Sequence, residues 1–246
     1  MRSRIIAFVF CLLFSHSAFA VLAIDGAIST VFSGSCAPPT PCTMTFSNSL
    51  TNDVLIMTSI GPTSNITGIT DSAGLTWHFR KVVTVATNNL EIWYAVSSGV
   101  LTSDTISVVY GATGFSPRLT VFGINGANLT TPFDPNGSLP ASATGTTATT
   151  LTNTISTNSA NDMLLAWVRS SASLGTVTEP SGFSQIVNTG AGADQSSKIV
   201  SSIQTSLGVV YSWSGATTAS GMVVDAVQQA GGAAPANLDL AFPASP

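Results

Sequence analysis

Glu91 and Trp93 are the residues of this chain whose types and spacing best suit contact with a ligand. Alternate residues of a β-strand share one face, so the carboxylate and the indole would lie side by side. An indole face can stack on a sugar ring while a carboxylate accepts hydroxyl protons. Trp213, in the later strand-like segment 209–213, adds a second indole. The pattern favours Trp93, Glu91 and Trp213 as carbohydrate-binding residues, with a semi-buried strand as the alternative interpretation.

Catalytic chemistry finds less support in the sequence. His78 is the only histidine beyond position 20, so a Ser-His-Asp arrangement would have to use it. It stands between Trp77 and Phe79, where alternation turns it to solvent, and no Gly-x-Ser-x-Gly elbow is present. A glycan-cleaving enzyme would need a second carboxylate facing Glu91. We therefore expect no enzyme, and a jelly-roll glycan-cleaving enzyme is the third of our hypotheses.

Metal binding is the other chemistry to weigh. Carboxylates at recurring turn positions suggest calcium, as at Asp53, Asp71, Asp162 and Glu179. Side chains that bond the backbone of a turn explain the same positions, and no Asp-x-Asp-x-Asp string occurs. Zinc would need a cluster of His and Cys ligands. The sequence predicts no cofactor and no metal site, and it leaves calcium open.

Residues 1–20 are typical of a secretory signal peptide. Arg2 and Arg4 precede the apolar stretch 5–14, which is too short to span a bilayer as a helix. The tripeptide Ala-Phe-Ala at 18–20 suits a signal peptidase. No later stretch is apolar and long enough for a membrane helix. We therefore expect an exported protein, secreted or at the cell surface, that leaves the membrane after cleavage.

The charge balance limits the partners. Cleavage would remove two of the seven basic residues and none of the eleven acidic ones, and only 7% of the chain is charged. Nucleic acids and anionic membranes are bound through clustered Lys and Arg, so neither is an expected partner. A polysaccharide, a cell-surface protein or another copy of this chain fits a surface of hydroxyls and amides.

Cys36 and Cys42 remain when Cys11 is removed with the signal peptide. They bracket a Pro-rich insert at 37–41, and an exported chain enters an oxidising compartment. A metal pair would need two further ligands nearby. The spacing predicts a disulfide between Cys36 and Cys42, and its small loop should contribute about 2–3 kcal/mol.

Short segments of alternating apolar and polar residues recur along the chain, each ended by Gly, Pro, Asn, Asp or Ser. The clearest are residues 54–60, 75–85, 90–96, 105–110 and 119–124. No stretch has the 3.6-residue apolar rhythm of a capped helix. The pattern predicts an all-β fold, a two-sheet sandwich rather than an α/β protein.

An internal repeat suggests that the sandwich is built from two halves. Three motifs return in the same order, at offsets of 109, 108 and 104 residues: 51–56 as 160–165, 69–75 as 177–183, and 111–113 as 215–217. We expect pseudo-repeats at about 45–130 and 150–227 that together form one jelly-roll-like domain over 21–227. Two separate small domains are the alternative.

Two further expectations follow from the repeat. Its register places Lys198 and Val200 at the positions of Glu91 and Trp93, so the acid and indole pair would lie outside the duplicated framework. Residues 228–246, rich in Ala, Gly and Pro, are typical of a flexible C-terminal tail.

Three segments resemble a pattern of exported bacterial and phage β-sandwich proteins. They are Asn-Asp-Val-Leu at 52–55, Ile-Thr-Asp-Ser-Ala-Gly-Leu-Thr-Trp at 69–77 and Glu-Ile-Trp-Tyr-Ala at 91–95. Proteins of that group carry a "TDSAGNTW…IWYA" pattern, and the resemblance covers about residues 45–227. It implies a jelly-roll-like fold and an extracellular role, without an activity.

The sequence thus predicts a non-catalytic extracellular structural or adhesive β-sandwich module, able to self-associate through its strand edges. A carbohydrate-binding module that uses Trp93 and Glu91 is the alternative.

Overall fold

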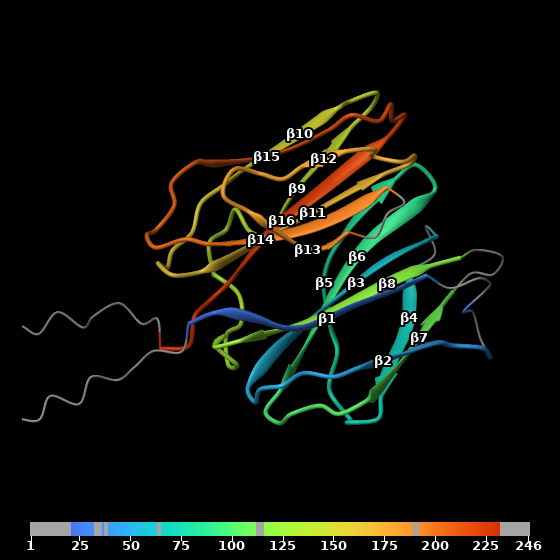
Figure 1. Cartoon of the computed structure of the whole chain (residues 1–246), viewed down its shortest axis with the longest axis vertical. Helices are drawn as coiled ribbons and strands as arrows, with labels where there is room; N and C mark the ends of the chain where they lie inside the picture. The colour runs from blue at the N-terminus through green and yellow to red at the C-terminus, as the bar shows by residue number, and fades with distance from the viewer. Residues whose placement is uncertain are drawn as a thin grey trace, which may run out of the picture.

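A computed structural model describes residues 21–31, 36, 39–62, 65–111, 116–188 and 192–231 (Figure 1). This part of the chain consists of β-strands joined by turns and loops, and it contains no helix that could cross a membrane. The predicted signal peptide, 1–20, lies outside the described residues. So does most of the predicted tail, of which only 228–231 are described.

The first half contains eight strands arranged in two antiparallel sheets. The larger sheet has the order β1-β8-β3-β6-β5, and the smaller has the order β2-β7-β4. The strands are β1 (Ala23–Val31), β2 (Cys42–Phe46), β3 (Asp53–Pro62), β4 (Ile66–Asp71), β5 (His78–Val85), β6 (Asn88–Ser97), β7 (Asp104–Tyr110) and β8 (Arg118–Asn125).

The second half repeats this topology strand for strand. Its sheets have the orders β9-β16-β11-β14-β13 and β10-β15-β12, so that each strand corresponds to the one eight places earlier. The strands are β9 (Ala141–Gly145), β10 (Thr150–Ile155), β11 (Met163–Ser170), β12 (Val177–Thr178), β13 (Ser184–Asn188), β14 (Ala193–Ile199), β15 (Leu207–Trp213) and β16 (Ser220–Val227). The predicted all-β sandwich of two pseudo-repeated halves is confirmed. Each half forms two sheets of its own, so the jelly-roll strand order occurs once in each half and not once for both halves together.

Three apolar cores hold four layers of sheet together. One core lies between the two sheets of the first half and includes Phe46 and Leu55. A second lies between the two sheets of the second half and includes Leu164. The third joins the two five-stranded sheets face to face and includes Ile56 and Trp167. Both five-stranded sheets are therefore covered on both faces, as Figure 1 shows.

This layering explains the sequence of the central strands. In β2 apolar and polar residues alternate, because one face of the small sheet meets solvent. In β11 every residue is buried, and the sequence Met-Leu-Leu-Ala-Trp-Val has no alternation. Packing between the halves is close at Gly221, where a Cβ atom would lie 2.5 Å from Val85 Cγ2.

One ion pair crosses between the halves. A bulge between Phe79 and Lys81 redirects Arg80, whose Nε and Nη2 donate to the Asp225 carboxylate at 2.7 and 2.9 Å. The guanidinium also lies 4.1 Å from the centre of the Phe133 ring. Asp225 is fully buried. Burial raises the pKa of Asp225, and the bonds and charge of Arg80 lower it.

The predicted disulfide is present. Cys36 and Cys42 are bonded, with their Cα atoms 4.8 Å apart, and both side chains belong to the core of the first half. The bond ties the start of β2 to the residue whose carbonyl accepts the Tyr110 N–H at 3.0 Å, at the end of β7.

Arg80→Ala should destabilise the protein by about 3–5 kcal/mol, because it leaves the Asp225 carboxylate buried without its counter-charge. Urea unfolding measures the effect. Lys81→Ala is the matched control, since no ion pair involves Lys81 among the described residues, and it should change stability by less than about 0.5 kcal/mol. Equal effects of the two substitutions would contradict the role given to the ion pair.

Candidate functional site

Glu91 faces the core of the first half and does not reach the surface. Its side chain is 1% exposed and accepts hydrogen bonds from Ile66 N and Trp93 Nε1, each at 3.2 Å. Burial raises the pKa of Glu91, and these two donors lower it. The shared face expected for Glu91 and Trp93 exists, but it is turned inward, because β4 covers this part of β6.

Trp213 does not join the other two candidates. It is 5% exposed and belongs to the core of the second half, whereas Trp93 is half-buried beside the core of the first. Glu91, Trp93 and Trp213 therefore do not form one exposed surface. The cause is that both faces of β6, and the inner face of β15, are covered by neighbouring sheets.

An aromatic group does reach the surface at β5. Phe79 is 50% exposed and packs edge-on against Trp93, with ring centres 5.3 Å apart. His78 is exposed, as expected, and stacks on Tyr94 at 5.1 Å. The contact described for His78 is therefore aromatic.

The pairing of the strands corrects the expected register of the repeat. Glu91 pairs with Ser59 on β3, six residues after Asp53. In the second half the residue six places after Asp162 is Val168, and it pairs with Asp194 on β14. Asp194, rather than Lys198, is therefore the counterpart of Glu91. A buried carboxyl is part of the duplicated framework after all, while the counterpart of Trp93 is Ser196 and not Val200.

The Asp194 carboxyl lies in a polar cluster inside the second half. Gln185 Nε2 donates to Asp194 Oδ2 at 2.8 Å and to Glu179 Oε1 at 3.3 Å. Burial and the neighbouring Glu179 carboxyl raise the pKa of Asp194 to about 8. Two adjacent carboxyls that share a proton can act as acid and base only where a substrate reaches them. Asp194 is fully buried, so a substrate does not reach this pair in the structure.

A second pair of acids marks one end of each half. Asp25 accepts hydrogen bonds from the N–H groups of residues 49 and 50, at 3.0 and 2.6 Å. Asp134 accepts them from residues 158 and 159, at 2.8 and 2.9 Å. Donors and acceptors are all displaced by 109 residues, so the repeat begins earlier than the motifs in the sequence indicated.

The Asn-Asp turns of the repeat place another buried acid beside each of these. Asn52 and Asn161 have φ values of 65° and 64°, a left-handed conformation that Asn tolerates. The Asp53 and Asp162 side chains that follow are fully buried. Asp71, by contrast, bonds its own turn by accepting Leu75 N at 2.9 Å, as expected for a structural turn residue.

The two halves treat these buried acids differently. Asn48 Nδ2 and Asn125 Nδ2 donate to Asp53 at 2.6 and 3.0 Å. Burial raises the pKa of Asp53, and both amides lower it. Neither carboxylate oxygen of Asp162 has a hydrogen-bond donor. Burial and the neighbouring Asp134 carboxyl raise the pKa of Asp162 to about 8.

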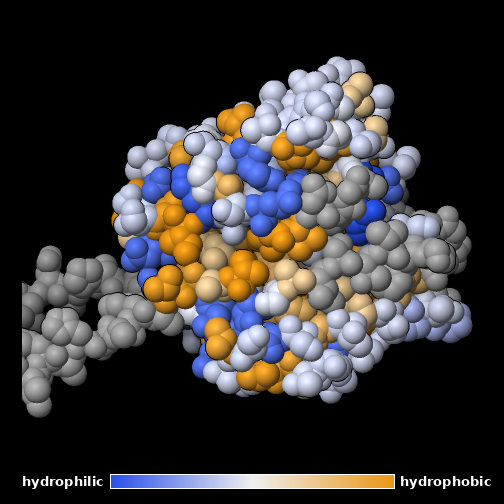
Figure 2. Space-filling view, viewed as in Figure 1, coloured by the Kyte–Doolittle hydropathy of each residue, from blue (hydrophilic) through white to orange (hydrophobic). Residues whose placement is uncertain are grey.

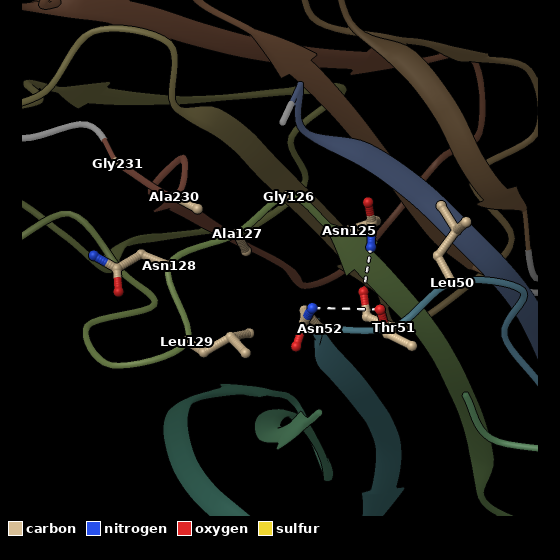
Figure 3. Close-up of a pocket in the computed structure, with 10 residues that line it drawn as sticks. All are labelled: Leu50, Thr51, Asn52, Asn125, Gly126, Ala127, Asn128, Leu129, Ala230 and Gly231. Atoms are coloured by element: carbon tan, nitrogen blue, oxygen red, sulfur yellow. Dashed lines mark hydrogen bonds between the residues drawn. The ribbon is translucent and has the colours of Figure 1, made fainter. Parts of the chain in front are cut away.

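Pockets occur at equivalent places beside both turns. The first has a volume of about 500 Å³ and is lined by residues 50–52, 125–129 and 230–231 (Figure 3). Figure 3 shows the hydrogen bond from Asn125 Nδ2 to Thr51 O, 2.6 Å long, at its edge. The second has about 280 Å³ and is lined by Asn128, Thr131, 159–160, Asp162 and 228–229. Asn128 belongs to both, so the pockets adjoin at the connection between the halves.

These pockets are the candidate site that the sequence did not reveal. The larger pocket combines amides and hydroxyls with the apolar side chains of Leu50 and Leu129, and Asp162, in the smaller pocket, is the one acid among the lining residues. Within the described ranges no three of the residues Asp, Glu, His and Cys cluster as a metal site would require of side chains alone. The displacement of 109 residues that relates Asp25 to Asp134 was the sequence feature from which this pair of equivalent sites could have been predicted.

Asp194→Asn should stabilise the protein above neutral pH. A carboxyl whose folded pKa is about 8 keeps its proton while the unfolded chain loses one near the ordinary value of 3.8. Its contribution is fully present below about pH 4 and is lost as pH rises to 8, at up to about 1.4 kcal/mol per pH unit. Urea unfolding from pH 4 to 9 should show a shallower decline in the variant. An unchanged slope would contradict the shared proton.

Comparison with known proteins found no matching family model, no matching curated protein and no matching solved structure. The function is therefore argued from the residues of this chain.

Proposed function

We propose that this protein is a non-catalytic, exported structural or adhesive module, which acts by presenting rigid sheet faces to its neighbours. Export rests on the signal-like sequence of residues 1–20. The observation that carries the proposal is that few charged side chains reach the surface. Within the described part of the chain, every Asp, Glu, Lys and Arg side chain is buried or half-buried.

Such a surface favours contact with another surface of the same kind. Copies of a protein with exposed charge repel one another, and that repulsion keeps many proteins apart in solution. Here the carboxylates are bound inside by amides, backbone N–H groups and Arg80. What remains outside is a layer of hydroxyls and amides, which can bond to a neighbour without desolvating an ion.

The outer faces of the two small sheets are rows of threonine. Thr150, Thr152 and Thr154 of β10 are exposed while the residues between them are buried. Thr43 and Thr45 of β2 repeat the arrangement in the first half. Figure 2 shows pale colours, typical of Thr and Ser, over the upper sheet of β10 and β15. Threonine has few rotamers, so ordering these side chains against a neighbour costs little entropy.

The carbohydrate-binding alternative keeps one observation in its favour. Phe79 is half exposed against Trp93 at the edge strand β5, where a sugar ring could stack on the phenyl face. Glu91 lies beneath this pair and would not contact the ligand. The burial of Glu91 also removes the basis for a glycan-cleaving enzyme, which needs two carboxylates that reach the substrate.

Sedimentation velocity of residues 21–246 over a wide concentration range tests the structural proposal. We expect the weight-average mass to rise with concentration. Lysine at four outer-sheet positions should abolish the rise by charge repulsion: Thr43, Thr45, Thr152 and Thr154. Lysine at four exposed loop positions is the control of equal charge and should leave it intact: Thr87, Ser98, Thr102 and Ser201. A monomer at every concentration, or equal behaviour of the two variants, would count against the proposal.

A pull-down on a panel of insoluble and soluble polysaccharides tests the alternative. If the protein binds sugar through β5, Phe79→Ala should abolish retention without changing the far-ultraviolet circular dichroism. Ile203→Ala removes an equally exposed apolar side chain from the other half and should bind like the wild type. No retention on any glycan would end the alternative.

A further inference from the structure

The Asp162 side chain is buried and lacks both a hydrogen-bond donor and a counter-charge among the described residues. The residue is fully buried, and neither of its oxygens accepts a hydrogen bond. A buried carboxylate without donors or a counter-charge costs several kcal/mol, so proteins provide a partner. No described basic residue forms an ion pair with Asp162 or Asp134, because the ion pair found in the described ranges is that of Arg80 with Asp225.

The first half shows what is missing. Asn48 Nδ2 and Asn125 Nδ2 satisfy Asp53 there. The counterpart of Asn48 is Thr157, which bonds to Gln204 in the loop between β14 and β15. Thr157 N donates to Gln204 O, and Thr157 Oγ1 accepts Gln204 N, both at 3.0 Å. Its hydroxyl donates to Ser159 O at 3.1 Å and is not available to the acid.

The counterpart of Asn125 is equally occupied. Asn125 pairs with Asp53, and the β11–β16 register, which begins at Met163 and Val227, places Gln228 opposite Asp162 when it is extended by one residue. Its Nε2 donates to Ser159 Oγ at 3.2 Å, and its Oε1 accepts Thr131 Oγ1 at 3.5 Å. The substitution of both asparagines in the second half has therefore removed both donors while keeping the pair of acids.

The surroundings of Asp162 are rich in oxygen ligands. The Asp134 carboxyl neighbours that of Asp162, although Asp134 is not among the residues that line the pocket. It accepts three backbone N–H groups, those of residues 136, 158 and 159, at 2.8–2.9 Å. Asp162 also lines the 280 Å³ pocket, with the side chains of Asn128, Thr131 and Gln228 around it. This space is large enough for an ion and several waters.

The ligands that surround Asp162 are all oxygen atoms, and they indicate which ion the site would prefer. Two carboxylates with amide and hydroxyl oxygens suit Ca²⁺, which takes six to eight oxygen ligands in flexible geometry. The pocket contains neither His nor Cys, the ligands that Zn²⁺ and other soft metals prefer. Mg²⁺ would need a near-ideal octahedron and holds its own waters more tightly.

We propose that the pocket at the start of β11 binds one Ca²⁺, with Asp162 and Asp134 as its charged ligands and the oxygens of the pocket wall and water completing its shell. The ion takes the place that the two asparagine amides occupy in the first half. It joins the loop after β8 to the start of β11, and so holds the connection between the halves.

Calorimetric titration of CaCl2 into residues 21–246, stripped with EDTA and dialysed, tests the proposal. We expect one site per chain with a dissociation constant of about 0.1–1 mM, the range of extracellular calcium modules, and a Tm that rises with Ca²⁺. MgCl2 at the same concentration should give a smaller shift. Absence of both heat and thermal shift in the wild type would overturn the proposal and leave a carboxyl pair that shares a proton.

Three variants locate the site. Asp162→Asn should abolish the response to Ca²⁺, whereas Asp53→Asn, the matched change in the first half, should retain one site. The double variant Thr157→Asn, Gln228→Asn keeps both acids and restores the two amide donors, so it should fold without Ca²⁺ and respond to it weakly. Ca²⁺ binding that persists in Asp162→Asn, or that is lost equally in Asp53→Asn, would contradict the assignment.

Discussion

Each five-stranded sheet of this protein has two apolar faces, and the structure depends on covering both. One face of each packs on the small sheet of its own half, and the other packs on the large sheet of the opposite half. Apolar burial contributes about 25 cal/mol per Å², so a half on its own would leave a costly face in water. The close approach at Gly221 and the ion pair of Arg80 with Asp225 sit on this shared face.

The same constraint determines where the polar groups lie. Central strands covered on both sides still carry Asp53, Glu91, Asp162 and Asp194, and each must be satisfied inside. Amides and backbone N–H groups satisfy the two acids of the first half. In the second half, Asp194 has Gln185 and the Glu179 carboxyl, while Asp162 has only another carboxyl beside it. Duplication supplied the acids, and divergence changed what neutralises them.

The surface carries few charged groups because most of the acids are buried in the interior. The acids bond to turns and strand ends, where they are buried or half-buried. Ser and Thr cover the outer sheets instead. These Ser- and Thr-rich outer sheets are the basis of the proposed packing against neighbours. At the junction of the halves, the buried acid Asp162 lines the smaller pocket.

Local patterns were sufficient to predict the strands, the repeat and the disulfide. Alternation in β2 and β10 and the Asn-Asp turns are readable because each depends on a few neighbouring residues. The four-layer arrangement could not be predicted from these patterns. The unbroken apolar run of β11 indicates that both faces of the strand are buried, but it does not indicate which elements cover them. The same ambiguity made Glu91 look like a surface ligand.

The register of the repeat failed for a related reason. The offset between the halves falls from 109 at Asp53 to 103 at Glu91, because residues are lost in the loops between β11 and β14. An offset of 107, between those of the neighbouring motifs, therefore matched Glu91 to Lys198, and only strand pairing identified Asp194. Arg80 and Asp225 lie 145 residues apart, and no local pattern could have joined them.

Differential scanning calorimetry of residues 21–246 is the most direct test of the shared apolar face. If the two large sheets depend on each other for burial, the halves unfold together. The account predicts a single transition whose calorimetric enthalpy equals the van't Hoff enthalpy. Two separate transitions, or a calorimetric enthalpy about twice the van't Hoff value, would show that the halves are independent and would contradict the account.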